Sequence, residues 1–361
     1  MLKIIRPDLP HHCRIICVSD IHGNLKWFKK LLDKCGYNAG ADYLFILGDI
    51  VEKGRDNLAT LRFVKELCQN ERVICIKGNN DTMCGRMAFH DTKEKFFDRL
   101  KSRPRNTYLE MAESIGIDSF DSDFEAKRQR VNKKFAHELD FAENLPLAIE
   151  TKDFIFIHAG IENRPDWENT SEKFALTTPW YMDMCHQSEK TVICGHYPVY
   201  NYRAANFASL PVTDKKKRII DIDGGASTKF AQQLNALIIA YNEGEYTLDT
   251  VFQPIGEEMR VKFNVNSEEK PVYVDWEHWD LTVIDKREDF YLVKINQTGE
   301  TGLIPQSHTG EWDGKLHGWI HLSCFLSAEA GEKFCKCGET QEYFFGIKDN
   351  GKTGFLPKFA F

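Results

Sequence analysis

The chain has 361 residues, of which 42% are apolar and 28% are charged, and its formal net charge at pH 7 is −7. This length predicts about two domains, and the ordinary apolar fraction excludes a disordered or collagen-like chain. No apolar run approaches the roughly 18 residues of a membrane-spanning helix, so we expect no membrane protein. The negative charge also argues against nonspecific binding of nucleic acid, which needs a basic surface.

The start of the chain and its cysteines indicate a reducing compartment. Residues 1–8 lack the apolar core and small-residue cleavage site of a secretory signal. The eleven cysteines are an odd number without framework spacing, and several lie in apolar runs, where a reduced thiol behaves as a small hydrophobe. We therefore expect a cytoplasmic protein.

Residues 13–252 alternate short apolar runs, typical of strands, with amphipathic stretches, typical of helices. The predicted strands lie at 14–18, 43–47, 72–76, 154–157, 192–194, 219–222 and 236–240. Helices are predicted within 25–35 and 58–68, because apolar residues recur there every three to four positions. Residues 82–145 carry dense mixed charge and are predicted to form a helical insertion or cap. The fold class predicted for residues 1–253 is therefore α/β.

Residues 254–361 have a different, all-β character, with Gly turns and the tryptophans Trp276, Trp279, Trp312 and Trp319. Residues 289–305 align with 341–357 at a shift of 52, and each copy is a predicted strand, a Gly turn and a second strand. The pattern resembles the hairpin and final strand of SH3-like barrels. We expect two SH3-like repeats, 254–308 and 309–361, with the tryptophans either in their cores or in a groove for a peptide or protein partner.

Five predicted strands end in residues of the kinds that bind metals. Because the carboxyl ends of strands in an α/β fold are where ligands converge, these side chains are expected to meet. Carboxylates, imidazoles and an amide oxygen suit two divalent ions of the Mn, Fe, Zn or Ni type better than Ca²⁺. The residues are Asp20, His22, Asp49, Asn79, His158 and His196.

The motifs around these residues are Asp-x-His-Gly, Gly-Asp-x-Val-x-x-Gly, Gly-Asn-x-Asp, His-Ala-Gly and Gly-His, in this order. They resemble the motifs of the calcineurin-like metallophosphoesterases. The resemblance implies a four-layer α/β/β/α sandwich with a first metal on Asp20 and His22, a bridging Asp49, and a second metal on Asn79, His158 and His196.

Two further segments are similar to one branch of that superfamily. Residues 195–199 read Gly-His-Tyr-Pro-Val, similar to the Gly-His-Thr-Pro-Val of the phosphoprotein phosphatases. Residues 222–226, Ile-Asp-Gly-Gly-Ala, are similar to a segment of bacterial phosphatases and symmetric dinucleoside tetraphosphatases. The resemblance therefore implies the phosphoprotein phosphatase and tetraphosphatase branch.

The chain departs from this branch at the groups expected to handle the phosphate. Asn80 stands where a His protonates the leaving oxygen, next to Asp81, and an amide cannot serve as that acid. Glu52 and Lys53 stand where the branch has Asp-Arg, so a point charge replaces a guanidinium fork, and Arg55 is a second candidate clamp. These five residues are our catalytic candidates. Without the acid we expect a preference for good leaving groups, such as aryl phosphates or phosphoanhydrides.

The function that the resemblance implies is hydrolysis of phosphomonoesters, phosphoserine and phosphothreonine among them, by attack of a hydroxide that bridges two metal ions, most readily Mn. One alternative is a hydrolase of dinucleoside polyphosphates or other nucleotides, which needs a base-stacking pocket built from the insertion. A second is a binding or scaffold protein with a degenerate site, although all six ligand positions hold competent residues. The expected substrate is thus a phosphorylated small molecule, peptide or nucleotide.

Overall fold

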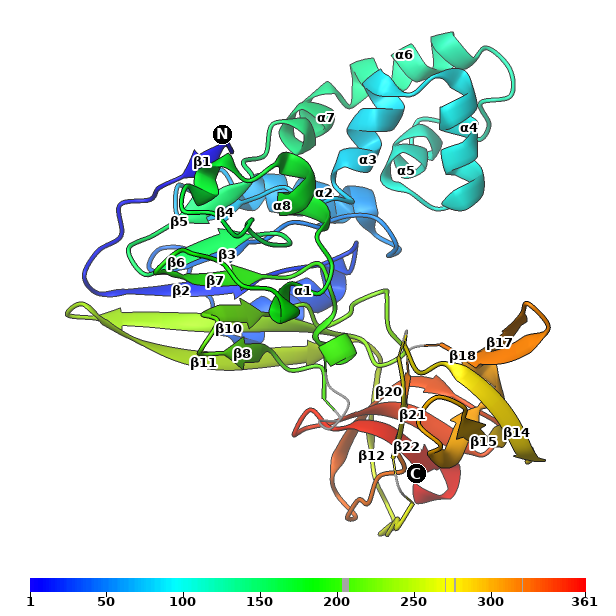
Figure 1. The fold of residues 1–361 in the computed structure, drawn as a ribbon. Coiled ribbons are helices and arrows are strands. Elements are labelled where there is room, and N and C mark those ends of the chain that lie inside the picture. Colours follow the sequence, from blue (N-terminus) through cyan, green and yellow to red (C-terminus); the bar gives the residue numbers. More distant parts are fainter. Residues whose placement is uncertain (203–207, 270, 276, 320) are drawn as a thin grey trace. The chain divides into compact units, whose positions relative to one another are not determined.

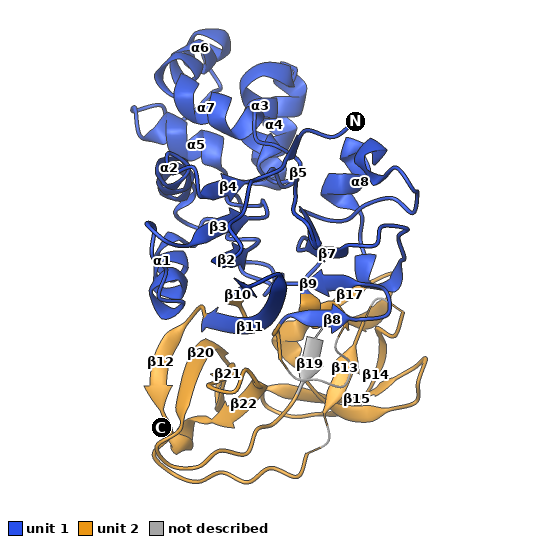
Figure 2. Cartoon of the chain, turned by 90° about the vertical axis from the view of Figure 1, so that its left-hand side faces the viewer, with its two compact units in different colours: residues 1–198, 211–228, 234–253 blue, residues 199–210, 229–233, 254–361 orange. Residues whose placement is uncertain are grey.

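The computed structural model describes residues 1–202, 208–269, 271–275, 277–319 and 321–361, so Trp276 lies outside the described residues. The chain divides into two compact units (Figure 2). Unit 1 comprises residues 1–198, 211–228 and 234–253, and unit 2 comprises residues 199–210, 229–233 and 254–361.

Unit 1 contains two sheets (Figure 1). The first has six strands in the order β1 (Ile4–Ile5), β5 (Ala148–Glu150), β6 (Phe154–Ile157), β7 (Thr191–Cys194), β9 (Ile219–Asp221) and β8 (Val212–Asp214). The second has five strands in the order β11 (Glu245–Pro254), β10 (Gln233–Asn242), β2 (Cys13–Val18), β3 (Tyr43–Ile46) and β4 (Val73–Cys75).

The two sheets pack face to face around one apolar core. The rings of Phe45 on β3 and Phe156 on β6 meet edge to face, with centroids 5.0 Å apart. Leu44 and Ile155, on the opposite faces of the same strands, are also fully buried. Because both faces are covered, these strands are apolar at every position, which explains the continuous apolar runs in the sequence. The α/β prediction is confirmed.

Parallel pairing brings the strand ends of each sheet to one edge. Strands β2, β3 and β4 run parallel, as do β6, β7 and β9. The helices α1 (Leu25–Lys34) and α2 (Asn57–Leu67) follow β2 and β3, and each buries an apolar stripe. Each motif loop therefore starts at the carboxyl edge of a buried strand.

Residues 82–145 are mainly helical. They form α3 (Thr82–Gly85), a π-helical turn (Arg86–His90), α4 (Lys93–Ser102), α5 (Thr107–Glu113), α6 (Phe124–Lys134) and α7 (Ala136–Glu143). Phe96 lies at the centre, with the rings of Tyr108, Phe120 and Phe124 at centroid distances of 5.7, 4.9 and 5.0 Å. This aromatic cluster gives the charged segment a core of its own. The last helix of unit 1, α8 (Glu172–Thr177), lies between β6 and β7 in the chain.

Unit 2 is built from strands and short 3-10 turns. One sheet has the order β12 (Glu257–Arg260), β20 (Lys333–Glu339), β21 (Tyr343–Lys348) and β22 (Thr353–Pro357). Another has the order β16 (Thr301–Pro305), β15 (Phe290–Ile295), β14 (Asp280–Lys286), β18 (Lys315–Gly318) and β17 (Thr309–Trp312). A third pairs β13 (Val272–Val274) with β19 (His321–Ser323). The β-rich character predicted for this part is confirmed.

The repeat found in the sequence is also a repeat of structure. Strands β14, β15 and β16 form an antiparallel meander that ends in a 3-10 turn, Gln306–His308, and β20, β21 and β22 do the same before Lys358–Ala360. Gly299 and Gly351 hold equivalent turn positions with φ of 79° and 80°. The hairpin registers differ by one residue, because Tyr291 pairs with Ile304 while its equivalent Tyr343 pairs with Pro357.

Two general properties of the chain complete the description of the fold. All eleven cysteines are free thiols. Across the described part of the chain, no helix has both the length and the apolar character required to span a membrane.

Candidate metal and active site

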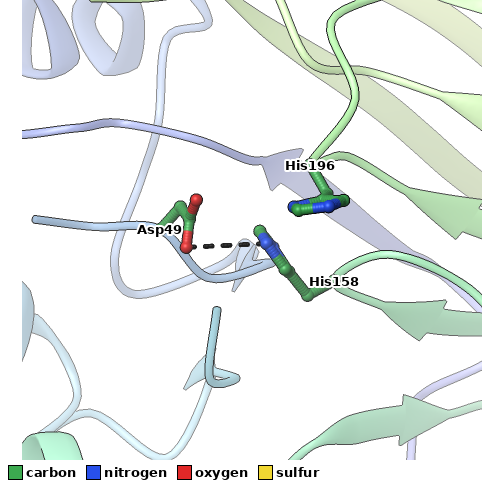
Figure 3. Close-up of side chains that lie close together, drawn as sticks. All are labelled: Asp49, His158 and His196. Carbon is green, nitrogen blue, oxygen red and sulfur yellow. Dashed lines mark ion pairs between the residues drawn. The ribbon is translucent and has the colours of Figure 1, made fainter. Parts of the chain in front are cut away.

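Six side chains from five loops gather at the carboxyl edges of the two sheets of unit 1. Two groups of ligand atoms each lie within 4.8 Å of one another: Asp20, His22 and Asp49, and Asp49, His158 and His196. Figure 3 shows the second group, in which the three side chains come from the loops that follow β3, β6 and β7. Because Asp49 belongs to both groups, its carboxylate lies where a bridge between two ions would be.

Hydrogen bonds to the backbone orient two of the imidazoles. Nδ1 of His22 lies 3.2 Å from the carbonyl oxygen of Val51, and Nδ1 of His158 lies 2.8 Å from that of Leu47. A carbonyl only accepts, so in both rings Nδ1 carries the hydrogen and the lone pair is on Nε2. These Nε2 atoms lie 3.6 and 3.5 Å from the carboxylate oxygens of Asp49. Each Nε2 therefore carries the lone pair that a metal ion would accept.

The surrounding atoms fit a cation at each group. Oδ1 of Asn79 lies 3.0 Å from Nε2 of His158, so two acceptors approach the same point. At the other group, the Lys53 ammonium lies 3.2 Å from Nε2 of His22 and supplies a positive charge there. Oδ1 of Asp20 is buried and has no hydrogen-bond partner among the described residues. Two divalent ions would satisfy these acceptors, and the mixed N and O donor set suits transition metals.

Burial sets the protonation states of these ligands. It raises the pKa of Asp20 to about 8, with the charge of Asp49 adding to the effect. It lowers the pKa of His22 to about 3 and that of His196 to about 4, so both imidazoles are neutral near pH 7. Burial acts to raise the pKa of Asp49 too, but His158 and His22 outweigh it and keep that pKa below its usual range. Neutral imidazoles and an ionised shared carboxylate are the forms that bind metal.

The ligand loops have an unusual backbone. A positive φ in a residue other than glycine is uncommon and tends to concentrate at functional sites. Twelve described residues of this kind occur, and half of them belong to the motif loops: Asp20, His22, Asp49, Glu52, Lys53 and His196. Close approach also explains Gly78, where an added Cβ would lie 2.1 Å from the Asp49 nitrogen and 2.2 Å from its Oδ1.

Asp81 holds the loop that carries Asp49. Its carboxylate accepts hydrogen bonds from the backbone N–H groups of Asp49, Ile50 and Gly78, at 2.9, 2.9 and 2.8 Å. Burial raises its pKa to about 7, and the charge of Asp49 adds to this. Since both oxygens bind the backbone, the structure gives Asp81 a positioning geometry, whereas the sequence grouped it with the catalytic candidates.

Asn80 connects the shared carboxylate to an arginine that the sequence analysis did not identify. The Asn80 side-chain Nδ2 donates to Oδ2 of Asp49 at 2.5 Å, and its Oδ1 accepts from Nη1 of Arg103 at 2.6 Å. Arg103 follows α4 in the helical insertion, where no motif marks it. The sequence held one indirect signal for Arg103. Because the second motif lacks its arginine, a guanidinium from another part of the chain could take that place.

Glu52 ties the second motif to the insertion. It is fully buried, and its Oε1 accepts hydrogen bonds from the N–H and Oγ1 of Thr107, at 3.0 and 2.6 Å. Burial raises its pKa above the usual value. Glu110, one turn further along α5, accepts from the side chain of Asn57 at 2.6 Å and the backbone of Leu58 at 2.7 Å. The start of α5 is thus fixed to the catalytic core of unit 1.

The two basic clamp candidates differ in their placement. Lys53 reaches the first ligand group through His22. Arg55 is exposed, and no hydrogen bond or ion pair of its side chain is found among the described residues. The structure therefore brings Lys53 into the site and does not join Arg55 to it.

A partly exposed aromatic pair includes the residue that follows the metal ligand His196. The rings of Trp180 and Tyr197 have centroids 5.7 Å apart, and Tyr197 directly follows His196. Trp180 is 46% exposed and has a φ of 52°, an outlier for such a bulky residue. Tyr197 is part of the Gly-His-Tyr-Pro-Val segment, but the sequence assigned no role to its ring, and Trp180 belongs to no motif or periodic pattern.

Comparison with known proteins agrees with this geometry. Residues 13–224 match the model of the calcineurin-like phosphoesterase family. The chain is 32% identical over 92 residues to a symmetrical bis(5'-nucleosyl)-tetraphosphatase of Aromatoleum aromaticum, covering 23% of this chain and 33% of that protein. It is 36% identical over 97 residues to the protein of the same description from Buchnera aphidicola, covering 26% and 34%. The chain thus matches about a third of the length of these curated relatives.

Among solved structures, a protein serine/threonine phosphatase from Saccharomyces cerevisiae aligns with 71% of this chain and 84% of its own, at 12% identity and a TM-score of 0.46. The family match alone spans more than half of the chain and all five motif loops. The chain therefore belongs to the calcineurin-like phosphoesterase family, whose members are metal-dependent phosphoester hydrolases.

Proposed function

We propose that this protein hydrolyses phosphoanhydride and phosphoester bonds with two divalent metal ions, and that dinucleoside polyphosphates are its substrates. The observation that carries the proposal is the pair of ligand groups that share Asp49. Asp20 and His22 would hold one ion, and Asn79, His158 and His196 the other. Mn²⁺ is the first ion to test, with Fe, Zn and Ni as the others that this donor set accepts.

When bound, two such ions polarise a phosphoryl oxygen and make a bound water acidic enough to attack phosphorus. The protein's own residues prepare this chemistry. The backbone N–H of Asn80 donates to Oδ1 of Asp49 at 2.8 Å, and its side chain donates to Oδ2, so both oxygens of the shared carboxylate are fixed. The Asp81 carboxylate accepts hydrogen bonds from two backbone N–H groups of the same loop, those of Asp49 and Ile50. Lys53 places a positive charge at the first ligand group.

Two observations favour a nucleotide over the phosphomonoester that the sequence analysis placed first. The curated relatives are symmetrical bis(5'-nucleosyl)-tetraphosphatases. Trp180 and Tyr197 also offer an exposed aromatic surface beside His196, and stacking of a base on an aromatic side chain is worth about 1–3 kcal/mol. From the sequence, a base-stacking pocket was expected within the helical insertion. The surface proposed here lies outside that insertion.

The remaining sequence expectations are kept as part of the proposal. We keep residues 1–253 as a four-layer α/β/β/α sandwich and residues 254–308 and 309–361 as two SH3-like repeats, which exchange strands because β12 pairs with β20 and β18 pairs with β14. The repeated meander with its 3-10 turn supports the second assignment. A peptide or protein partner of this part, and a cytoplasmic location, remain our predictions.

The experiment is a comparison of substrates at saturating Mn²⁺ with the full chain. Diadenosine tetraphosphate, a phosphoserine peptide and p-nitrophenyl phosphate are each assayed for kcat/KM, with Asp49→Asn as the control for metal-dependent turnover. We expect kcat/KM for diadenosine tetraphosphate to exceed that for the phosphopeptide by at least about tenfold. A phosphopeptide hydrolysed as efficiently as the dinucleotide contradicts the substrate assignment, and turnover that survives in Asp49→Asn contradicts the whole proposal.

A further inference from the structure

We propose that Arg103, supplied by the helical insertion, binds the phosphoryl group of the substrate in place of the arginine missing from the second motif. The inference rests on the proposed function, because it assigns a residue to the same reaction. It adds a substrate-binding residue that lies outside all five motifs.

One N–H group of the Arg103 guanidinium is hydrogen-bonded at the site, and this contact leaves its other donors unengaged. Its Nη1 donates to Oδ1 of Asn80 at 2.6 Å, and within the described ranges no carboxylate pairs with it. A guanidinium has five N–H donors in a planar fork, and it stays charged at any working pH. Most of these donors are therefore available to an incoming anion. The positive charge of Arg103 acts to lower the pKa of the buried Glu52 carboxyl, which forms no ion pair with it among the described residues, so the rest of the fork can still receive an anion.

Asn80 places this charge one amide group away from the metal ligands. The same side chain donates to Oδ2 of Asp49 at 2.5 Å and accepts from Arg103. An anion bound beside Asp49 would therefore lie near the positive charge of Arg103. Asn80 thus acts as a positioning residue for Arg103, a role that needs an amide with one donor and one acceptor and explains why no acid stands there.

The backbone around Arg103 is fixed on both sides. Its N–H donates to the carbonyl of Arg99 at 2.8 Å, and Arg99 in turn pairs with Asp91 at 2.5 Å. Its own carbonyl accepts from Nδ2 of Asn106 at 3.0 Å, while Oδ1 of Asn106 caps α5 by accepting from the N–H of Leu109 at 2.9 Å. The segment is therefore ordered before substrate arrives, which lowers the entropy cost of binding.

The chemical consequence concerns charge and not proton transfer. Phosphoryl transfer spreads negative charge over the equatorial oxygens, and a guanidinium fork stabilises that charge through two parallel hydrogen bonds. Lys53, which lies beside His22 of the first ligand group, offers only a point charge. No bond to Arg103 forms or breaks in this role.

The test compares Arg103→Gln with Arg105→Gln, a matched control that removes the same charge from an exposed arginine two positions along the chain. The probe is inorganic phosphate, followed both as an inhibitor of p-nitrophenyl phosphate hydrolysis and by calorimetric titration of the Mn²⁺-loaded full chain. We expect Arg103→Gln to weaken the binding of inorganic phosphate and to raise the KM for p-nitrophenyl phosphate, each by about 10- to 100-fold. Arg105→Gln should change each of these two quantities by less than about twofold.

A second variant, Arg103→Lys, keeps the charge and loses the fork, so it is expected to fall between the wild type and Arg103→Gln. If Arg103→Gln melts at a much lower temperature than the wild type, the test rests on phosphate binding by Arg103→Lys compared with that by the wild type. Phosphate binding by Arg103→Lys equal to that of the wild type overturns the inference, as does an Arg103→Gln variant that matches Arg105→Gln. A wild-type chain that binds phosphate but hydrolyses nothing contradicts the proposed function alone, because the calorimetric comparison still tests Arg103.

Discussion

Nε2 of His158 lies 3.5 Å from Oδ1 of Asp49, although the strands that precede the two residues belong to different sheets. Asp49 follows β3 of the five-stranded sheet, and His158 follows β6 of the six-stranded sheet. The site therefore exists only when the two sheets pack face to face. The metal ligands therefore lie close together only in the packed core.

Gly78 is predicted to be required for the geometry of Asp49. A Cβ at this position would lie 2.2 Å from Oδ1 of Asp49, so Gly78→Ala must displace the shared carboxylate. We expect a loss of at least about tenfold in kcat, with a destabilisation of about 1–3 kcal/mol, because overpacking forces the loop to shift. Gly40→Ala is the control, since its Cβ would meet only the end of the Asn38 side chain, at 3.4 Å. Equal activity in the two variants would show that the close contact is unimportant.

Trp180 is predicted to discriminate between substrate classes. If its ring stacks on a base, Trp180→Ala should reduce kcat/KM for diadenosine tetraphosphate about 5- to 100-fold more than kcat/KM for p-nitrophenyl phosphate, which has no base. Trp319, which is also 46% exposed but lies in unit 2, provides the matched control. An equal effect of Trp180→Ala on both substrates argues against a stacking role.

Because a general acid is missing, the rate of hydrolysis is predicted to depend strongly on the leaving group of the substrate. Asn80 donates to Asp49 but cannot release a proton to a leaving oxygen. The wild type is expected to favour aryl over alkyl phosphates strongly, and Asn80→His to reduce the ratio of their kcat/KM values by at least about tenfold, because an acid helps a poor leaving group most. The same ratio in both enzymes contradicts this view of Asn80.

The pairing of Arg14 with Asp42 is predicted to make stability depend on pH. Burial acts to raise the pKa of Asp42, but two hydrogen bonds from Arg14, at 2.6 and 2.9 Å, outweigh it and lower that pKa below its usual value. The pair therefore stabilises the fold above the unfolded-state pKa of about 3.9, and this contribution is lost as the pH falls through the lower folded-state pKa.

Asp42→Asn is accordingly expected to lower the free energy of unfolding by about 1–3 kcal/mol at pH 7 and by progressively less as the pH falls below about 4. Asp33→Asn, which changes an exposed carboxylate, should have little effect at either pH. Denaturant unfolding at pH 7 and pH 3.5 measures both. A destabilisation by Asp42→Asn that is the same at the two pH values would rule out the ionic contribution.

The sequence was sufficient for the core strands and for the ligands that follow them. Strands β3 and β6 are buried at every position, as are the last four residues of β2, so an apolar run marks each strand in the sequence. The ligand residues lie one to four positions beyond the strands that precede them, and local spacing therefore places them. By contrast, β11 is largely exposed and β1 has two residues, so no apolar pattern marked either one.

Residues that reach the site from a distance could not be found in this way. Arg103 contacts Asn80 only because the insertion folds around its own aromatic core and is tied back through Glu52. Trp180 contacts Tyr197 because the two loops that carry these residues lie side by side in the folded chain. Nothing local in the sequence encodes such contacts, because they depend on tertiary packing of segments without a periodic pattern.

Metal stoichiometry tests the central claim most directly, because the account requires two ions that share Asp49. Calorimetric titration of the metal-free full chain with Mn²⁺ should give two ions per chain for the wild type. Asp49→Asn, which preserves shape and removes the shared charge, should lose at least one ion and reduce p-nitrophenyl phosphate hydrolysis by at least about 100-fold. Binding of two ions with unchanged affinity by Asp49→Asn, or hydrolysis at the wild-type rate, would contradict the account.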